Sequence, residues 1–175
     1  MGILIGFLPW LIYGVLLSLG HLKIAIAIPL AFMLLAGRQD LWGAHLKVLS
    51  LGTFSFLVAM LGAAFFVPPD RLSPWLPVLS HSALLLITLV SILIGKPFTI
   101  EYAREEVPQE RWNTPRFLRV NYVLTFGWLL AFFIMTILPT AKLLGWHVHP
   151  LIYGLVSLGT MTAAYVFTGW YKKKK

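Results

Sequence analysis

The sequence predicts an all-α, polytopic transmembrane bundle of six helices with both termini in the cytoplasm. Composition is the first reason, because 59% of the 175 residues are hydrophobic and 11% are charged. Soluble domains are about half apolar and a quarter charged, so a soluble chain of this length could not bury that much apolar surface. The second reason is a set of long stretches without charge, and the third is the uneven placement of lysine and arginine. We therefore expect one transmembrane domain over residues 1–175.

Six stretches without Asp, Glu, Lys or Arg mark the expected helices. They are residues 2–22, 24–37, 48–69, 72–95, 120–141 and 143–171. A helix needs about 20 residues to cross roughly 30 Å of hydrocarbon, and five of the stretches reach that length. The second, from Ile24 to Gly37, is shorter and crosses if Lys23 extends its side chain to the interface. If it does not cross, the bundle has five helices.

The basic residues set the orientation. With six crossings, 11 of the 14 lysines and arginines lie on the cytoplasmic side and three on the other, as the positive-inside rule requires. With five crossings the numbers become 12 and two, and the N-terminus lies outside. Charge therefore leaves both topologies open, although they agree from Val48 onward. Six crossings are favoured because residues 18–21 predict a tight turn between two apolar helices.

Aromatic and small residues indicate where helices end and where they pack. Rings expected at helix ends are Trp42, Trp75, Trp146, Trp170 and Tyr171, whereas Trp10 and Trp128 lie deeper and are expected to pack. Small residues recur at spacing four in two series, Ser55, Ala59 and Ala63, then Gly159 and Ala163 beside Thr160 and Ala164. Such stripes let helices approach closely in lipid. We expect packing within the chain, with a homodimer face as the alternative.

The most distinctive segment is the polar loop 96–119, which we expect on the cytoplasmic side. It holds four of the six carboxylates, and Pro97, Pro108 and Pro115 divide it into short pieces. Thr99 is expected to cap a short helical turn. Apolar residues are interleaved throughout, so the loop should lie along the membrane surface, either as a docking platform or lid, or as a plain interfacial connector. Candidate binding residues are Lys96, Glu101, Arg104, Glu105, Trp112, Arg116 and Arg119.

The basic tail at residues 172–175 is expected to anchor the last helix on the cytoplasmic side and to attract anionic lipid. No Asp, Glu, Lys or Arg lies at mid-depth in the membrane, which argues against an ion-coupled carrier. The absence of cysteine excludes disulfides, thiolate metal sites and cysteine nucleophiles. No two carboxylates in the polar loop have the spacing of a catalytic acid and base. No catalytic residue is identified.

Histidine supplies a separate hypothesis. His81 lies about a turn and a half into the fourth stretch, where a neutral imidazole could bind haem or a transition metal with His21 or His149. The other interpretation is a histidine hydrogen-bonded to a neighbouring helix. Three of the four histidines on that side fall in predicted turns, which favours this second interpretation. We expect no cofactor, with haem or metal kept as the alternative.

Several residues spread along the chain carry a family resemblance. They are Phe7-Leu8-Pro9 in the first helix, Lys96-Pro97 after the fourth, Trp112 before the fifth, and Asn121, Trp128, Phe132 and Phe133 within the fifth. Together they resemble the bacterial intracellular septation protein A family of inner-membrane proteins. The charged run from Tyr102 to Arg111 departs from that family's pattern. The resemblance implies an inner-membrane protein of septation or envelope maintenance that acts through protein contacts without established catalysis.

The sequence therefore favours a non-catalytic membrane protein of the cell envelope, working through protein or lipid contacts. The expected partners are the lipid bilayer and envelope proteins or a second copy, and no nucleic acid. The alternatives are a small transporter or lipid-handling protein, and a haem- or metal-binding redox subunit.

Reporter fusions test the predicted topology. A reporter that is active only in the cytoplasm should be active at the N-terminus, because six crossings return both ends to the same side. The same reporter at the C-terminus should be active with five or six crossings and serves as the control. An N-terminal reporter seen only outside would establish five crossings, and terminal lysines reachable only from outside would contradict both topologies.

Overall fold

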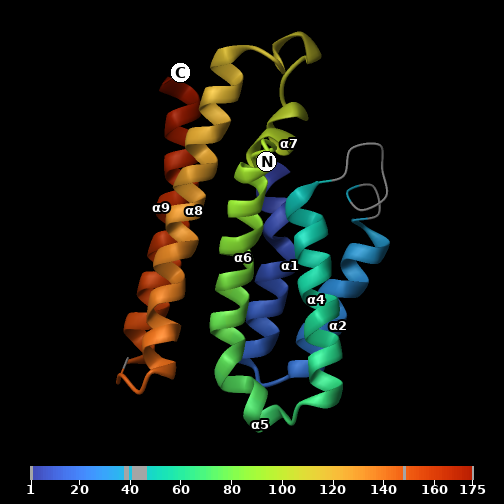
Figure 1. Cartoon of the computed structure of the whole chain (residues 1–175), viewed down its shortest axis with the longest axis vertical. Coiled ribbons are helices and arrows are strands. Elements are labelled where there is room, and N and C mark those ends of the chain that lie inside the picture. Colours follow the sequence, from blue (N-terminus) through green and yellow to red (C-terminus); the bar gives the residue numbers. More distant parts are fainter. Residues whose placement is uncertain (1, 38–39, 41–46, 148, 175) are drawn as a thin grey trace. The chain divides into compact units, whose positions relative to one another are not determined.

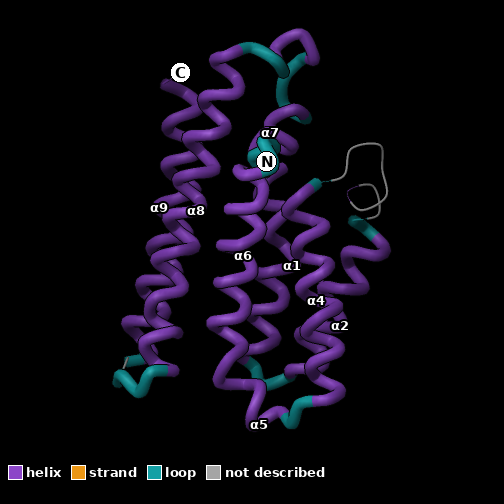
Figure 2. Tube along the Cα trace, in the orientation of Figure 1, coloured by secondary structure: helices purple, strands orange, loops and turns teal. Residues whose placement is uncertain are grey.

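The computed structural model describes residues 2–37, 40, 47–147 and 149–174, and every regular element among them is helical (Figure 2). The chain divides into two compact units, residues 1–74 and 75–175. The first contains α1 (Gly2–Ser18), α2 (Leu22–Leu35), α4 (Val48–Phe66) and α5 (Pro69–Leu72), and a 3-10 turn at Ser73–Trp75 follows (Figure 1). The second contains α6 (Leu76–Leu93), α7 (Phe98–Arg104), a 3-10 turn at Gln109–Arg111, α8 (Pro115–Leu143) and α9 (Pro150–Lys174).

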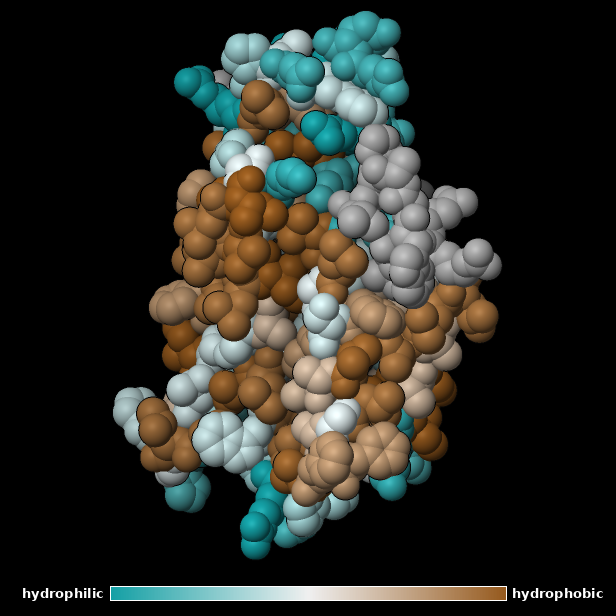
Figure 3. All heavy atoms as spheres, turned by 45° about the vertical axis from the view of Figure 1, so that its right-hand side comes forward, coloured by the Kyte–Doolittle hydropathy of each residue, from teal (hydrophilic) through white to brown (hydrophobic). Residues whose placement is uncertain are grey.

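Four helical stretches in the described chain are long and apolar enough to cross a membrane. They are Val48–Phe66, Pro69–Leu93, Pro115–Leu143 and Leu151–Lys173. Much of their apolar surface is exposed, as at Leu86 and Leu130, which are 58% and 59% exposed. In Figure 3 apolar side chains cover the lengths of the helices and hydrophilic ones gather at their ends. These features indicate an integral membrane protein, because exposed apolar surface on this scale is stable in hydrocarbon and costly in water.

The first unit confirms the predicted turn between two apolar helices. Gly20 has φ +80°, and the backbone N–H groups of Gly20 and His21 donate to the carbonyls of Leu17 and Leu16. This pair of bonds satisfies the last carbonyls of α1, and the left-handed backbone that it needs favours glycine. α2 has 14 residues and rises only about 21 Å, so it is shorter than the hydrocarbon layer.

Trp10 ties α1 to α4, as expected of a packing residue. Its indole stacks on Phe56 with ring centroids 4.9 Å apart, and Tyr13 meets Phe56 edge-on at 5.8 Å. The indole Nε1–H donates to the Thr53 hydroxyl at 2.8 Å, and that hydroxyl donates to the Leu49 carbonyl at 2.7 Å. The one polar atom of the ring is thereby satisfied within an apolar contact.

In the second unit, α8 is the central helix and packs against α6, α7 and α9. Its buried face includes Leu124, Trp128, Ala131 and Phe132. Trp128 is 1% exposed, and its Nε1–H donates to the Thr168 hydroxyl of α9 at 3.1 Å. The prediction that Trp128 packs inside the bundle is therefore confirmed. Trp42 lies outside the described residues.

The small-residue stripes pack only in part. Ala164 is buried, as predicted, but Gly159 and Ala163 are exposed. On α4, Ser55 and Ala59 are exposed and Ala63 is half-buried, so this stripe does not pack within the chain along its length. α4 buries instead Leu49, Ser50, Thr53, Leu57 and Met60. The Thr53 hydroxyl accepts the hydrogen bond of the Trp10 indole, so the face of α4 that carries Thr53 points inward.

The Trp128–Thr168 contact gives a test of α8–α9 packing. Thr168→Val should lower the stability of the purified protein, because the indole N–H is left buried without an acceptor. A double-mutant cycle with Trp128→Phe, measured by thermal unfolding in detergent, should give a coupling of about 0.6 kcal/mol, the average for such bonds in membranes. Thr162→Val on the exposed face of α9 is the matched control and should change little. Additive single effects would show that the bond contributes nothing.

Candidate functional site

The segment between α6 and α8 packs against other helices of the second unit. α6 ends at Leu93, and Gly95 follows it with φ +72°. The Lys96 N–H donates to the Ser91 carbonyl at 2.9 Å. The three prolines divide the segment as predicted: Pro97 precedes α7, Pro108 precedes the 3-10 turn, and Pro115 is the first residue of α8. Proline suits these starts because its missing N–H would have no helical partner there.

Thr99 fastens α7 to α8. Its hydroxyl donates to the Asn121 carbonyl at 2.9 Å and lies 2.8 Å from the Thr125 hydroxyl. A hydroxyl has one proton to donate, so Thr125 must be the donor in the second bond. The prediction that Thr99 caps a helical turn is therefore wrong, because Pro97 occupies the cap and Thr99 points into the bundle.

The apolar residues of α7 are buried in protein rather than laid along the membrane surface. Phe98, Ile100 and Tyr102 are at most 6% exposed. This corrects the expected surface-lying loop for its first half. The physical reason is that α7 forms a helix whose inward side chains find an apolar surface on α6 and α8. Glu105 and Lys96 remain exposed, and Glu101 is half-buried.

Trp112 holds the second half of the segment together through two contacts. Its Nε1–H donates to the Val107 carbonyl at 3.0 Å, and the Arg104 guanidinium lies over its ring, 5.0 Å from the centroid. A cation over an indole contributes about 0.5–1 kcal/mol where water can reach it. Two of the predicted binding residues, Arg104 and Trp112, are thus brought together.

α8 begins four residues before the predicted end of the loop. Thr114 is its N-cap, and the Thr114 hydroxyl accepts from Phe117 N–H at 3.3 Å. Arg116 and Arg119 therefore belong to a helix, not to the loop, and both are exposed. With 29 residues α8 rises about 44 Å, which exceeds the roughly 30 Å of hydrocarbon.

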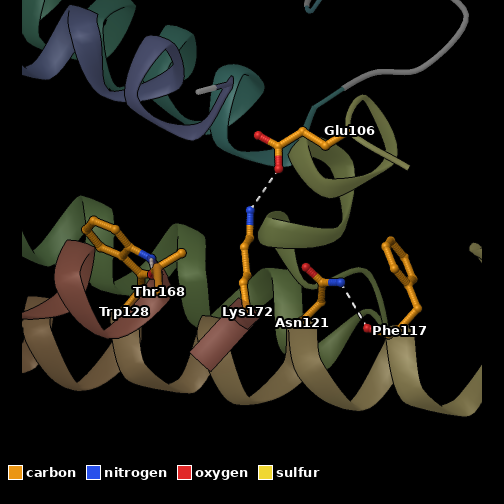
Figure 4. Close-up of polar contacts among 6 residues, drawn as sticks. All are labelled: Glu106, Phe117, Asn121, Trp128, Thr168 and Lys172. Atoms are coloured by element: carbon orange, nitrogen blue, oxygen red, sulfur yellow. Dashed lines mark hydrogen bonds and ion pairs between the residues drawn. The ribbon is translucent and has the colours of Figure 1, made fainter. Parts of the chain in front are cut away.

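A cleft of about 580 Å³ lies at this end of the second unit. One part of its wall is apolar and comes from Ala103, Val107, Phe117 and Val120. The charged part comes from Glu106, Arg111, Arg116 and Lys172. Lys172 of α9 reaches Glu106 at 3.1 Å, so the last helix is linked to the segment after α7 (Figure 4). Three cations and one carboxylate give the cleft a positive charge.

Asn121 lines the same cleft and is 2% exposed. Its Nδ2 donates to the Phe117 carbonyl at 2.9 Å, which fixes the amide orientation because a carbonyl cannot donate. Its Oδ1 is buried and accepts no hydrogen bond from the part of the chain that the structure describes. In Figure 4 this oxygen points away from the Phe117 contact, toward the side where Lys172 stands. A buried acceptor without a donor is costly, so the position suits a donor from outside the chain.

The sequence identified part of this arrangement. Of the predicted binding residues, Arg116 lines the cleft, Arg104 and Trp112 pack on each other, and Lys96 and Arg119 do not line the cleft. Glu106, Arg111 and Asn121 were missed, and Lys172 was assigned to the basic tail rather than to this site. A signal for Lys172 was present, because the tail and the loop were both expected on the cytoplasmic side. Nothing in the sequence indicated that Asn121 turns inward.

The histidine candidates do not form a ligand cluster in the described chain. His21 and His149 are exposed, and Nδ1 of His149 accepts from Leu151 N–H at 3.2 Å. His81 is half-buried and meets the Tyr153 ring edge-on, with centroids 6.3 Å apart. Among the described residues, no three His, Asp or Glu side chains are placed to hold a metal ion together. Haem or metal binding stays an untested hypothesis.

The fold and the cleft define a class: a helical integral membrane protein with a charged cleft at one end of its second unit. Comparison with known proteins adds no name to that class, since no family model, curated protein or solved structure matches the chain. The resemblance to the septation protein A family accordingly stays a prediction.

The hydroxyl chain through Thr99 can be tested directly. Thr99→Val should speed hydrogen exchange across Phe98–Arg104 about fivefold, because the mutant loses its bond to the Asn121 carbonyl, worth on the order of 1 kcal/mol. Thr125→Val should have a smaller effect, since Thr99 can still donate to that carbonyl. Equal protection in Thr99→Val and the wild type would show that packing alone holds α7.

Proposed function

We propose that this protein is a non-catalytic component of the bacterial inner membrane, working through contacts made at the cytoplasmic end of its second unit. The proposal includes six crossings with both termini inside. It rests on one observation: the segment between α6 and α8 is a folded platform fixed to the bundle, not a free connector. A rigid surface costs less conformational entropy on binding than a flexible one.

The distribution of charge supports this placement. In the second unit, Arg104, Arg111, Arg116, Arg119 and Lys172 all fall near the start of α8 or the end of α9, whereas Lys142 falls at the opposite end of α8. Basic residues concentrate on the cytoplasmic side of membrane proteins. Trp170 and Tyr171 at the end of α9 suit the headgroup level.

An envelope partner is the first kind of contact proposed. The platform presents exposed Glu105 beside the half-buried Arg104–Trp112 pair. Aromatic and arginine side chains of this kind carry much of the binding energy at protein interfaces. A role in septation or envelope maintenance follows from the family resemblance and from no structural feature.

Lipid handling is the second candidate, and the cleft favours it. Its wall is cationic on one part and apolar on another, as the phosphate of a phospholipid and the apolar part next to it require. The described residues carry no group that recommends one transported solute, so a transport role has no comparable support.

Partner capture tests the first kind of contact. Combining Arg104→Ala, Glu105→Ala and Trp112→Ala should reduce co-purified envelope partners at least about tenfold after crosslinking in native membranes, because two interface-type side chains are removed. The measurement is quantitative mass spectrometry, with membrane insertion checked by fractionation.

Lys142→Ala, at the far end of α8, is the control for this experiment and should keep the same partners. Unchanged partners in the triple variant would contradict the proposal, as would equal loss in the control.

A further inference from the structure

We infer that the cleft between the α7–α8 connector and the end of α9 binds an anionic glycerophospholipid whose headgroup carries hydroxyl groups, such as phosphatidylglycerol. The inference deepens the proposed function and rests on its placement of this end in the cytoplasmic headgroup layer. The argument uses the charge of the cleft, its apolar wall and the buried Asn121 acceptor.

Charge complementarity points to a phosphate. Arg111 and Arg116 line the cleft, and neither has an ion-pair partner among the residues that the structure describes. Lys172 contributes a third cation, which Glu106 offsets. Guanidinium groups match phosphate oxygens in a bidentate fashion. The start of α8 adds the partial positive charge of a helix N-terminus to the same place.

Two acceptors point to a headgroup that also donates hydrogen bonds. The Asn121 Oδ1 is buried without a donor, and the Glu106 carboxylate lines the same cleft. A choline headgroup has no N–H or O–H to offer them. Glycerol hydroxyls donate to amide and carboxylate oxygens while the phosphate stays with the arginines.

The apolar wall points to a lipid rather than a free phosphate ester. Val107, Phe117 and Val120 line the cleft next to the charged groups. α8 crosses from the headgroup layer into the hydrocarbon within the residues that line the cleft, since the charge-free stretch begins at Val120. A bound lipid would keep its acyl chains in the bilayer. Only its headgroup and glycerol backbone would enter the cleft.

Lipid retention tests the inference on the full chain. Delipidated protein in detergent is incubated with phosphatidylglycerol, phosphatidylethanol or phosphatidylcholine of identical acyl chains, and bound lipid is counted by native mass spectrometry. Phosphatidylglycerol should be retained most. Phosphatidylethanol, which is anionic but has no hydroxyl, should be weaker, and phosphatidylcholine weakest. Equal retention of the three lipids would overturn the inference.

The matched variants remove the same charge at different places. Arg116→Gln with Lys172→Gln empties the cleft of two cations and should weaken phosphatidylglycerol retention about tenfold. Arg119→Gln with Lys173→Gln alters the neighbouring exposed residues, which do not line the cleft, and should keep wild-type retention. Equal loss in both pairs would reveal a diffuse surface attraction and overturn the site.

A variant that is expected to bind lipid more tightly is also needed, because a misfolded protein could explain a loss of binding but not a gain. Glu106→Gln removes the carboxylate and releases Lys172, so it should strengthen retention of phosphatidylethanol. Weaker or unchanged retention would count against a phosphate held by these cations. Soluble glycerol phosphate should not displace the lipid at millimolar concentration, and displacement would indicate a soluble ligand instead.

These results are independent of partner capture. Loss of partners with intact lipid retention would remove the proposed protein contact and leave the lipid site. Intact partners without lipid retention would leave the proposed function and remove this inference.

Discussion

The cleft depends on the hydrogen bonds that run from Thr125 through Thr99 to the carbonyl of Asn121. They hold α7 against the first turns of α8. Hydroxyl groups here are buried with polar partners, and such bonds are costly to break when no water replaces them. Because α7 is fixed, the turn that follows it can present Glu106 and Arg111 toward the end of α9. Without that attachment the same residues would belong to a mobile connector.

Long apolar stretches and the prolines between them made the helices predictable. Each of the six charge-free stretches contains a helix, because uninterrupted apolar runs in lipid have no better way to satisfy their backbone. Pro97, Pro108 and Pro115 correctly divided the connector, since proline is disfavoured inside a helix and tolerated in its first turn. Trp10 and Trp128 were correctly placed inside, because their rings lie too far from helix ends to reach the headgroups.

The contacts that could not be predicted from the sequence depend mostly on which way individual side chains point. Thr99 was read as a cap because threonine before a short charged run often is one, but the hydroxyl found a better partner on α8. Ser55 and Ala59 have the spacing of a packing stripe, yet Trp10 and Thr53 turn a different face of α4 inward. Asn121 and Lys172 are 51 positions apart, and only the antiparallel return of α9 along α8 brings them to one cleft.

The ion pair between Glu106 and Lys172 has a consequence for assembly. It joins residues 66 positions apart, and its basic partner comes from α9, the last helix of the chain. During biosynthesis the connector leaves the ribosome well before α9 does, so the cleft lacks one wall until the last helix has been inserted and has docked against α8. Nascent protein should therefore be unable to hold a headgroup there, and any ligand must arrive after translation has passed α9. Order of synthesis thus separates insertion of the connector from completion of the cleft.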